Sequence, residues 1–68
     1  MKRYTLVFDR VNQDVMMRSN RFLEEASLIE GVEIDKDTFS VIFEDGKEDS
    51  ILALAHKLHI VDLVNPQH

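Results

Sequence analysis

The chain has 68 residues, no cysteine and a formal net charge of −5. A chain of this length makes one domain with a small core, and the lack of cysteine excludes a disulfide and a thiolate zinc site. The acidic charge argues against general binding to nucleic acid or to anionic membranes, because both depend on Lys and Arg. No apolar run is long enough for a membrane span or a signal peptide, so we expect a cytoplasmic protein.

The first predicted element is a strand over residues 2–9. Polar and apolar residues alternate there, which is typical of a strand with one buried face. Tyr4, Leu6 and Phe8 should face the core, whereas Val7 should face the other way.

A long helix is predicted over residues 12–30. Asn12 is a good N-terminal cap, because its side chain can accept from a free N–H of the first turn, and Gly31 suits the left-handed position that ends a helix. One stripe should face the core, and it consists of Val15, Phe22, Ala26 and Ile29, with Ser19 and Leu23 beside it. The opposite side carries two large apolar residues that bracket two charged ones, namely Met17, Arg21, Glu24 and Leu28.

The second half of the chain predicts a β-hairpin and a second helix. Residues 32–35 and 38–44 both alternate, and a short polar turn separates them. The second helix should end near Leu58. At its start, Asp45 and Glu48 have the spacing of a capping box.

The last predicted element is a β-prone run over residues 60–64, followed by a frayed tail over residues 65–68. The order βαββα(β) predicts an α+β domain of the ferredoxin-like type, with two helices on one face of an antiparallel sheet. The first and third strands would then be central, and Val7 and Ile42 would be neighbours on the uncovered face.

This pattern resembles that of the heavy-metal-associated domains, the small copper-chaperone-like modules. The resemblance rests on the segments YTLVF, LIEGVEID, TFSVIFEDG and LAHKLHIVDLV. It implies the same fold, in which the family binds metal through Cys-x-x-Cys between the first strand and the first helix. The corresponding residues 10–17 read RVNQDVMM and contain no cysteine, so the family's ligands do not carry over. Asp9 also stands where small CRISPR-associated nucleases have an Asp, but the acidic charge argues against that function.

Three groups of side chains could bind metal ions. His56 and His59 are three residues apart on the second helix, so their imidazoles can meet. Met16 and Met17 offer soft sulfur ligands of the kind that Cu(I) prefers. A weak Ca²⁺ or Mg²⁺ site could form from the acidic cluster Glu44, Asp45, Glu48 and Asp49. Solvated histidines, packed methionines and a charged helix start explain the same residues, so we predict no metal and no cofactor.

The sequence has no catalytic constellation, because it lacks a cysteine nucleophile and a glycine-rich phosphate loop. We therefore predict a non-enzymatic protein-interaction or regulatory module that binds a protein partner or a second copy of the chain. The predicted contact residues are Met17, Arg21, Glu24 and Leu28 on the first helix, and Val7 and Ile42 on the sheet. Glu33, Asp35 and Glu44, with Asp62 as a further candidate, would form an acidic rim around the sheet face that favours a basic partner. The alternative is a metal-handling domain that uses Met and His in place of Cys.

Overall fold

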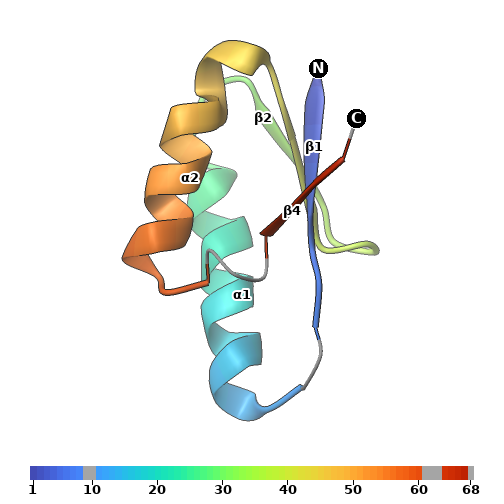
Figure 1. Cartoon of the computed structure of the whole chain (residues 1–68), viewed down its shortest axis with the longest axis vertical. Helices are drawn as coiled ribbons and strands as arrows, with labels where there is room; N and C mark the ends of the chain where they lie inside the picture. Colours follow the sequence, from blue (N-terminus) through green and yellow to red (C-terminus); the bar gives the residue numbers. More distant parts are fainter. Residues whose placement is uncertain (9–10, 61–63, 68) are drawn as a thin grey trace.

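The structure is a computed structural model that describes residues 1–8, 11–60 and 64–67. Its elements follow the order β1 (Lys2–Leu6), α1 (Gln13–Ala26), β2 (Val32–Asp35), β3 (Ser40–Phe43), the 3₁₀ turn η1 (Asp45–Lys47), α2 (Glu48–Lys57) and β4 (Val64–Gln67). Both helices lie on the same side of the sheet (Figure 1). The prediction of an α+β domain with two helices and an antiparallel sheet is confirmed.

The strands form one antiparallel sheet in the order β2-β3-β1-β4, so β1 and β3 are central. The C-terminus differs from the prediction, because β4 occupies residues that we expected to form a frayed tail. Pro66 lies within β4, opposite Tyr4. Proline is tolerated there because β4 is an edge strand, where a missing N–H need not remove a ladder hydrogen bond. Residues 61–63 of the predicted strand, like Asp9, lie outside the described residues.

The core lies between the sheet and the two helices, on the faces that the sequence predicts. Phe22 of α1 is 1% exposed and Phe43 of β3 is fully buried. The Tyr4 ring meets the Phe43 ring edge to face, with centroids 5.0 Å apart. The buried apolar residues are Tyr4, Leu6, Phe22, Leu23, Ala26, Val41, Phe43, Ile51, Ala55 and Ile60. Other apolar residues are half-buried at its edge, among them Phe8, Val32, Ile34, Phe39, Leu54 and Leu58.

Helix α1 begins as predicted but ends earlier. The N–H of Val15 donates to Oδ1 of Asn12 at 2.8 Å, so the predicted cap is present. The helix stops at Ala26 instead of residue 30, and the N–H of Leu28 reaches back only three residues, to the carbonyl of Glu25 at 3.1 Å. Leu28 therefore lies in the turn after the helix. Gly31 has the expected left-handed backbone, with φ of 84°.

The start of α2 does not contain the predicted capping box. Asp45 belongs to η1, and no side chain caps either η1 or α2. The Glu48 carboxylate instead accepts from Nζ of Lys2 at 2.6 Å. The long-range ion pair to β1 thus replaces the local interaction that the spacing predicted.

The end of α2 turns sharply through a Schellman motif. The N–H of Ile60 donates to the carbonyl of Ala55 at 3.0 Å, and the N–H of His59 donates to that of His56 at 3.1 Å. His59 has a left-handed backbone with φ of 57°, at a position where glycine is usual. His59 therefore lies beyond the helix, and buried Ile60 returns to the core next to Ala55.

Candidate functional site

The structure places the predicted contact residues of α1 on two different surfaces. Met17 is 63% exposed and Leu28 is 83% exposed, so both face away from the core as predicted. Met17 and Arg21 line a groove between α1 and the end of α2. Glu24 lines a separate pocket on the other flank of α1, and Leu28 lines neither. The four residues do not form one contact surface around either hollow.

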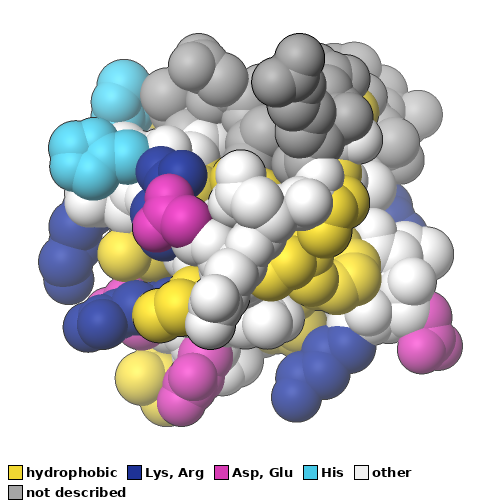
Figure 2. Space-filling model, turned by 90° about the horizontal axis from the view of Figure 1, so that it is seen from below, with side chains coloured by type: hydrophobic (Ala, Val, Ile, Leu, Met, Phe, Trp, Pro, Cys, Tyr) yellow, Lys and Arg dark blue, Asp and Glu magenta, His cyan; other side chains and the backbone are white. Residues whose placement is uncertain are grey.

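We call the first of these hollows the helix groove. It has a volume of about 260 Å³ and is lined by Asp14, Met17, Arg18, Arg21, Lys57, Leu58 and His59. Figure 2 views the end of the molecule where these segments meet, and it shows the two described histidines at one corner, near Lys or Arg side chains. An exposed thioether and a half-buried leucine thus lie among several cationic groups.

Arg18 holds the two sides of the helix groove together. Its guanidinium forms an ion pair with Asp14 at 2.8 Å, one helical turn away, and donates to the backbone carbonyl of His59 at 2.8 Å. The second contact bridges α1 to the turn that follows α2. Nε of Arg18 is buried and has no hydrogen-bond partner among the described residues. Arg18 is therefore a positioning residue that also carries charge at the groove.

The remaining charges of the helix groove converge on Glu25. Nε of Arg21 lies 3.2 Å from this carboxylate and Nζ of Lys57 lies 3.5 Å from it. The hydrogen bond from Arg21 lowers the pKa of Glu25, partial burial opposes this, and the charge of Lys57 adds to the lowering. Three cationic side chains thus share two carboxylates, those of Asp14 and Glu25. The groove carries excess positive charge on a chain whose net charge is −5.

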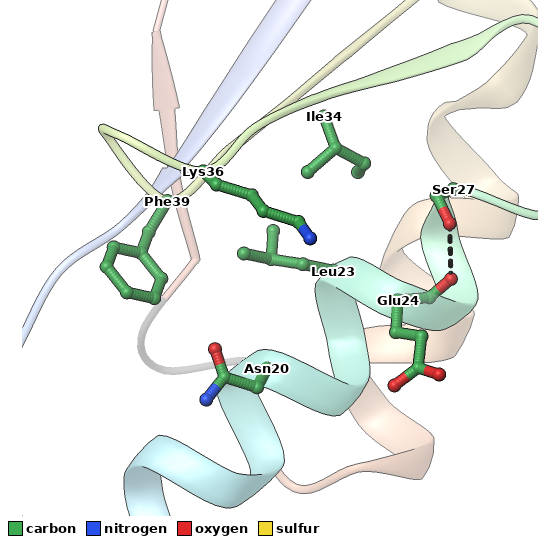
Figure 3. Close-up of a pocket in the computed structure, with 7 residues that line it drawn as sticks. All are labelled: Asn20, Leu23, Glu24, Ser27, Ile34, Lys36 and Phe39. Atoms are coloured by element: carbon green, nitrogen blue, oxygen red, sulfur yellow. Dashed lines mark hydrogen bonds between the residues drawn. The ribbon is translucent and has the colours of Figure 1, made fainter.

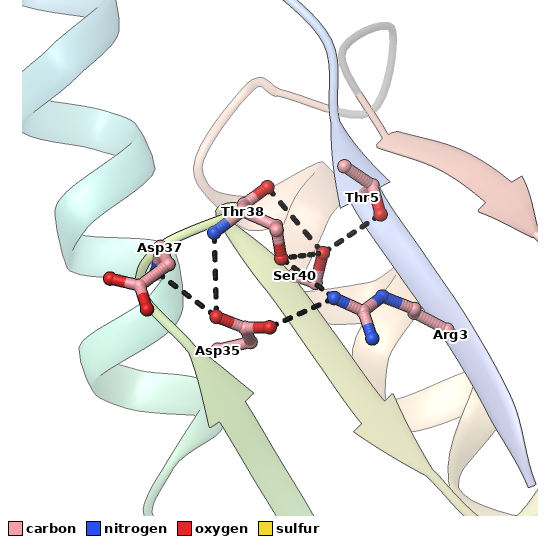
Figure 4. A network of polar contacts seen from close by, with 6 residues as sticks. All are labelled: Arg3, Thr5, Asp35, Asp37, Thr38 and Ser40. Atoms are coloured by element: carbon pink, nitrogen blue, oxygen red, sulfur yellow. Dashed lines mark hydrogen bonds and ion pairs between the residues drawn. The ribbon is translucent and has the colours of Figure 1, made fainter.

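The uncovered sheet face is polar at its centre. Arg3 donates to Asp35 at 2.9 Å and to Thr38 at 2.7 Å, and the hydroxyls of Thr5 and Ser40 are 2.8 Å apart (Figure 4). Partial burial raises the pKa of Asp35, but hydrogen bonds from Thr38 and Arg3 outweigh it and lower the pKa overall. The predicted acidic rim is therefore already neutralised in part by Arg3.

The register corrects the prediction that Val7 and Ile42 are neighbours. Ile42 pairs with Arg3, and the next pair of residues with the same facing is Thr5 with Ser40. Val7 is two residues beyond Thr5 along the chain and is 44% exposed, whereas Ile42 is half-buried. The hydroxyl pair separates the two aliphatic side chains. We infer that this face does not offer the apolar surface that we expected from the alternation alone.

The predicted His and carboxylate ligands do not gather into a group of three in the described part of the chain. No group of three or more His, Asp or Glu residues there could hold an ion. His56 and His59 are both exposed, and His59 lies past the end of α2, so the predicted helical spacing does not apply. In the acidic cluster, Glu48 forms an ion pair with Lys2.

Glu48 also affects the titration of a core residue. Burial raises the pKa of Tyr4, and a hydrogen bond to Glu48 adds to this increase.

Two residues of the helix groove were not predicted from the sequence to belong to a site. Arg18 and Lys57 lie 39 residues apart and on different helices, so no local pattern joins them. A weak signal was available on α1, because Asp14, Arg18, Arg21 and Glu25 follow a spacing of three and four residues along one flank. Of these four residues, the sequence analysis assigned only Arg21 to a contact surface.

Comparison of the chain with protein-family models, with curated proteins and with solved structures finds no significant match. These comparisons therefore give no support to a resemblance to the heavy-metal-associated domains. Within the described ranges, no helix combines the length and the apolar character that crossing a membrane would require.

Proposed function

We propose that this chain is a non-enzymatic interaction module that binds an acidic, partly apolar segment of a protein partner in the helix groove. One observation carries the proposal. Met17 is 63% exposed between α1 and α2, and Arg18, Arg21 and Lys57 line the same groove. These are three of the eight Lys and Arg residues of an acidic chain. Positive charge around an exposed apolar side chain selects a partner with the opposite charge and an apolar anchor.

The physical chemistry of the groove suits such a partner. Methionine is unbranched and polarisable, so Met17 can adapt its shape to an incoming apolar side chain. A charged rim around an apolar centre is the usual anatomy of a protein interface, and complementary charge mainly increases the association rate and the specificity. The volume of about 260 Å³ is enough for one or two partner side chains. We therefore expect a weak, transient complex, as is typical of interfaces smaller than about 1,200 Å².

We also propose that the fold is of the ferredoxin-like type. The strand order β2-β3-β1-β4, with antiparallel neighbours throughout, supports this assignment. The position of both helices on one side of the sheet supports it too (Figure 1). Because this fold hosts many unrelated functions, the proposed function depends on the helix groove and not on the fold.

The test uses synthetic peptides and the full, isotope-labelled chain. One short peptide has a leucine flanked by glutamates, a second has lysines in place of the glutamates, and a third has alanine in place of the leucine. We expect only the first to produce saturable NMR shifts at Met17, Arg18 and Leu58, and added salt should weaken its binding. Equal binding of the lysine peptide, or shifts that avoid the groove, would refute the proposal.

A matched pair of variants separates the groove from overall charge. Lys57→Gln removes a positive charge inside the helix groove, whereas Lys36→Gln removes the same charge outside it. Both side chains are exposed, so both variants should fold. Peptide binding should fall for Lys57→Gln and stay unchanged for Lys36→Gln. Equal losses in the two variants would mean that only the net charge of the chain matters.

The alternative function, metal handling by Met and His, has one observation in its favour. Met17 and His59 both line the helix groove, together with Asp14. The charges of Arg18, Arg21 and Lys57 oppose a cation at the same place, so we favour the acidic partner. Addition of Zn²⁺ or Cu(I) should therefore leave the unfolding transition unchanged, whereas native-state metal binding would raise stability.

A further inference from the structure

Strand β2 forms an open edge of the sheet. It comes first in the order β2-β3-β1-β4, so within the described residues it has a paired strand on one side only. The other edge strand, β4, contains Pro66, which lacks an N–H. Proline and bulges are common devices that block a sheet edge, but β2 has neither, because Val32–Asp35 pair with β3 in unbroken register. An edge of this kind can pair with another extended chain.

The hydrogen bonds of the hairpin show which backbone groups of β2 face this edge. The N–H of Leu6 donates to the carbonyl of Phe39 at 2.9 Å, so Phe39 and, two residues further on, Val41 turn their backbone groups to β1. Ile34 pairs with Val41, and this pair is therefore not hydrogen-bonded between β2 and β3. The N–H of Val32 agrees with this phase, because it donates within the preceding turn at 3.2 Å and not to β3. The N–H and C=O of Ile34 consequently point away from the sheet, at the open edge.

A pocket lies beside the same edge, between β2 and α1, and plays no part in the proposed function. We call it the hairpin pocket, and its volume is about 400 Å³. Figure 3 shows its lining, which comes from α1, β2 and the turn after β2: Asn20, Leu23, Glu24, Ser27, Ile34, Lys36 and Phe39. Leu23 is 3% exposed and belongs to the core, so this part of the pocket is firmly packed. Residues directly opposite each other on two strands have side chains on the same face, so a residue paired with Ile34 would point into the hairpin pocket.

The two faces of the β2 edge differ in charge. On the helix side, Lys36 lines the hairpin pocket and extends from the strand side toward α1 (Figure 3). Its ammonium group has no ion-pair partner among the described residues, so it disfavours a second cation on this face. On the uncovered side, Glu33 is exposed and its carboxylate has no described partner, while Asp35 forms an ion pair with Arg3 at 2.9 Å. A strand added at this edge should therefore carry apolar residues on the pocket side and basic residues on the uncovered side.

A second copy of β2 does not meet these requirements. If two copies paired about Ile34, Glu33 of each strand would lie opposite Asp35 of the other. A shift of two residues in either direction would place Glu33 or Asp35 opposite its own copy. Like charges directly opposite each other destabilise a sheet, so each register that pairs Ile34 is unfavourable.

We propose that the β2 edge binds an extended segment of another protein in which basic and apolar residues alternate. The segment adds a strand antiparallel to β2. An apolar residue pairs with Ile34, exchanges both backbone hydrogen bonds with it and enters the hairpin pocket. The residues before and after it place their positive charges near Glu33 and Asp35. In this mode of recognition the backbone hydrogen bonds supply affinity, and pockets for alternate side chains supply specificity.

Three peptides of identical charge test the proposal on the full, isotope-labelled chain. The parent peptide alternates Lys and Val over eight residues, a second has N-methyl groups on its two central valines, and a third has them on its two central lysines. Only the valines should point their N–H groups to β2. We expect the N-methyl-valine peptide to bind more weakly than the parent by about tenfold or more, because two backbone hydrogen bonds are lost, and the N-methyl-lysine peptide to bind like the parent.

The position of the NMR shifts separates this site from the helix groove. Saturable shifts should appear at Val32, Ile34 and Leu23 with the parent peptide, and the signals of Met17 should stay unchanged. Equal binding of the two N-methylated peptides, or no saturable shift in β2, would overturn the proposal and leave that for the helix groove intact.

Two variants test the charge on the uncovered side. Glu33→Gln removes the carboxylate beside the edge, whereas Asp49→Asn removes the same charge on α2. Both side chains are exposed, so both variants should fold. Binding of the parent peptide should weaken by about two- to fivefold for Glu33→Gln and stay unchanged for Asp49→Asn. Equal losses in the two variants would contradict the proposal. A dimer of the chain alone with Ile34 in its interface would assign the edge to a second copy and overturn it.

Discussion

Among the described residues, two that are not glycine have a left-handed backbone. Substitution by glycine should change the stability of the fold in opposite directions at these two positions. Phe39 has φ of 53° and His59 has φ of 57°, so the backbone strain is nearly the same. Such a conformation costs an L-residue about 1–2 kcal/mol, which glycine avoids. Part of that gain is lost because glycine is more flexible in the unfolded chain, by roughly 0.5–1 kcal/mol. The backbone gain from either substitution should therefore be about 0.5–1 kcal/mol.

His59→Gly should show this gain without a loss. The His59 side chain is exposed, and the contact with Arg18 uses the backbone carbonyl, which glycine keeps. We expect a stabilisation of about 0.5–1 kcal/mol and a melting temperature higher by roughly 2–8 °C. His59→Ala is the control, because it removes the imidazole but keeps the strain, and it should change stability little.

Phe39→Gly should instead destabilise the fold, by about 1–2 kcal/mol. Burial of a whole Phe side chain contributes about 1.5–3 kcal/mol, and this ring is half-buried. The edge-to-face contact with Phe8 adds roughly 0.5–1.5 kcal/mol. These losses exceed the backbone gain. Urea unfolding followed by far-UV circular dichroism measures all three variants, since the chain has no Trp. The reasoning is refuted if His59→Gly is no more stable than His59→Ala, or if Phe39→Gly is stabilising.

Three further predictions concern the core, the helix groove and acid stability. Phe22→Ala should cost about 3–5 kcal/mol, which approaches the roughly 3–10 kcal/mol expected for the whole domain, and a barely shifted urea transition would contradict the packing. Met17→Glu should abolish binding of the acidic peptide while Leu28→Lys leaves it intact, and sedimentation of both should show whether the same surface joins two copies. Asp35 has a pKa below its ordinary value of 3.8, so its stabilising effect is present above that pH and is lost as the pH falls through the lowered value. Asp35→Asn should therefore be less stable than the parent near neutral pH but lose less stability on acidification, and parallel acid titrations would disprove this.

Local sequence by itself determined the types of the two helices and of the first three strands, and which of their faces are buried. Alternation placed Tyr4 and Leu6 in the core, and the helical period did the same for Phe22 and Ala26, because solvent-facing and core-facing positions recur with different periods in the two elements. Asn12 could be assigned as a cap because its partner is only three residues away. The exposure of Met17 followed from the same helical phase.

Only the tertiary structure decided which distant residues meet, and therefore where the candidate sites are. Glu48 has the spacing of a capping box, but Lys2 of a distant strand takes its carboxylate. Strand register, which no local pattern determined here, placed a hydroxyl pair between Val7 and Ile42. The two hollows of α1 combine residues from different elements, such as Arg18 with Lys57 and Glu24 with Lys36. Periodicity describes the environment along one element, whereas a site depends on the packing of several, which the chain settles only when it folds.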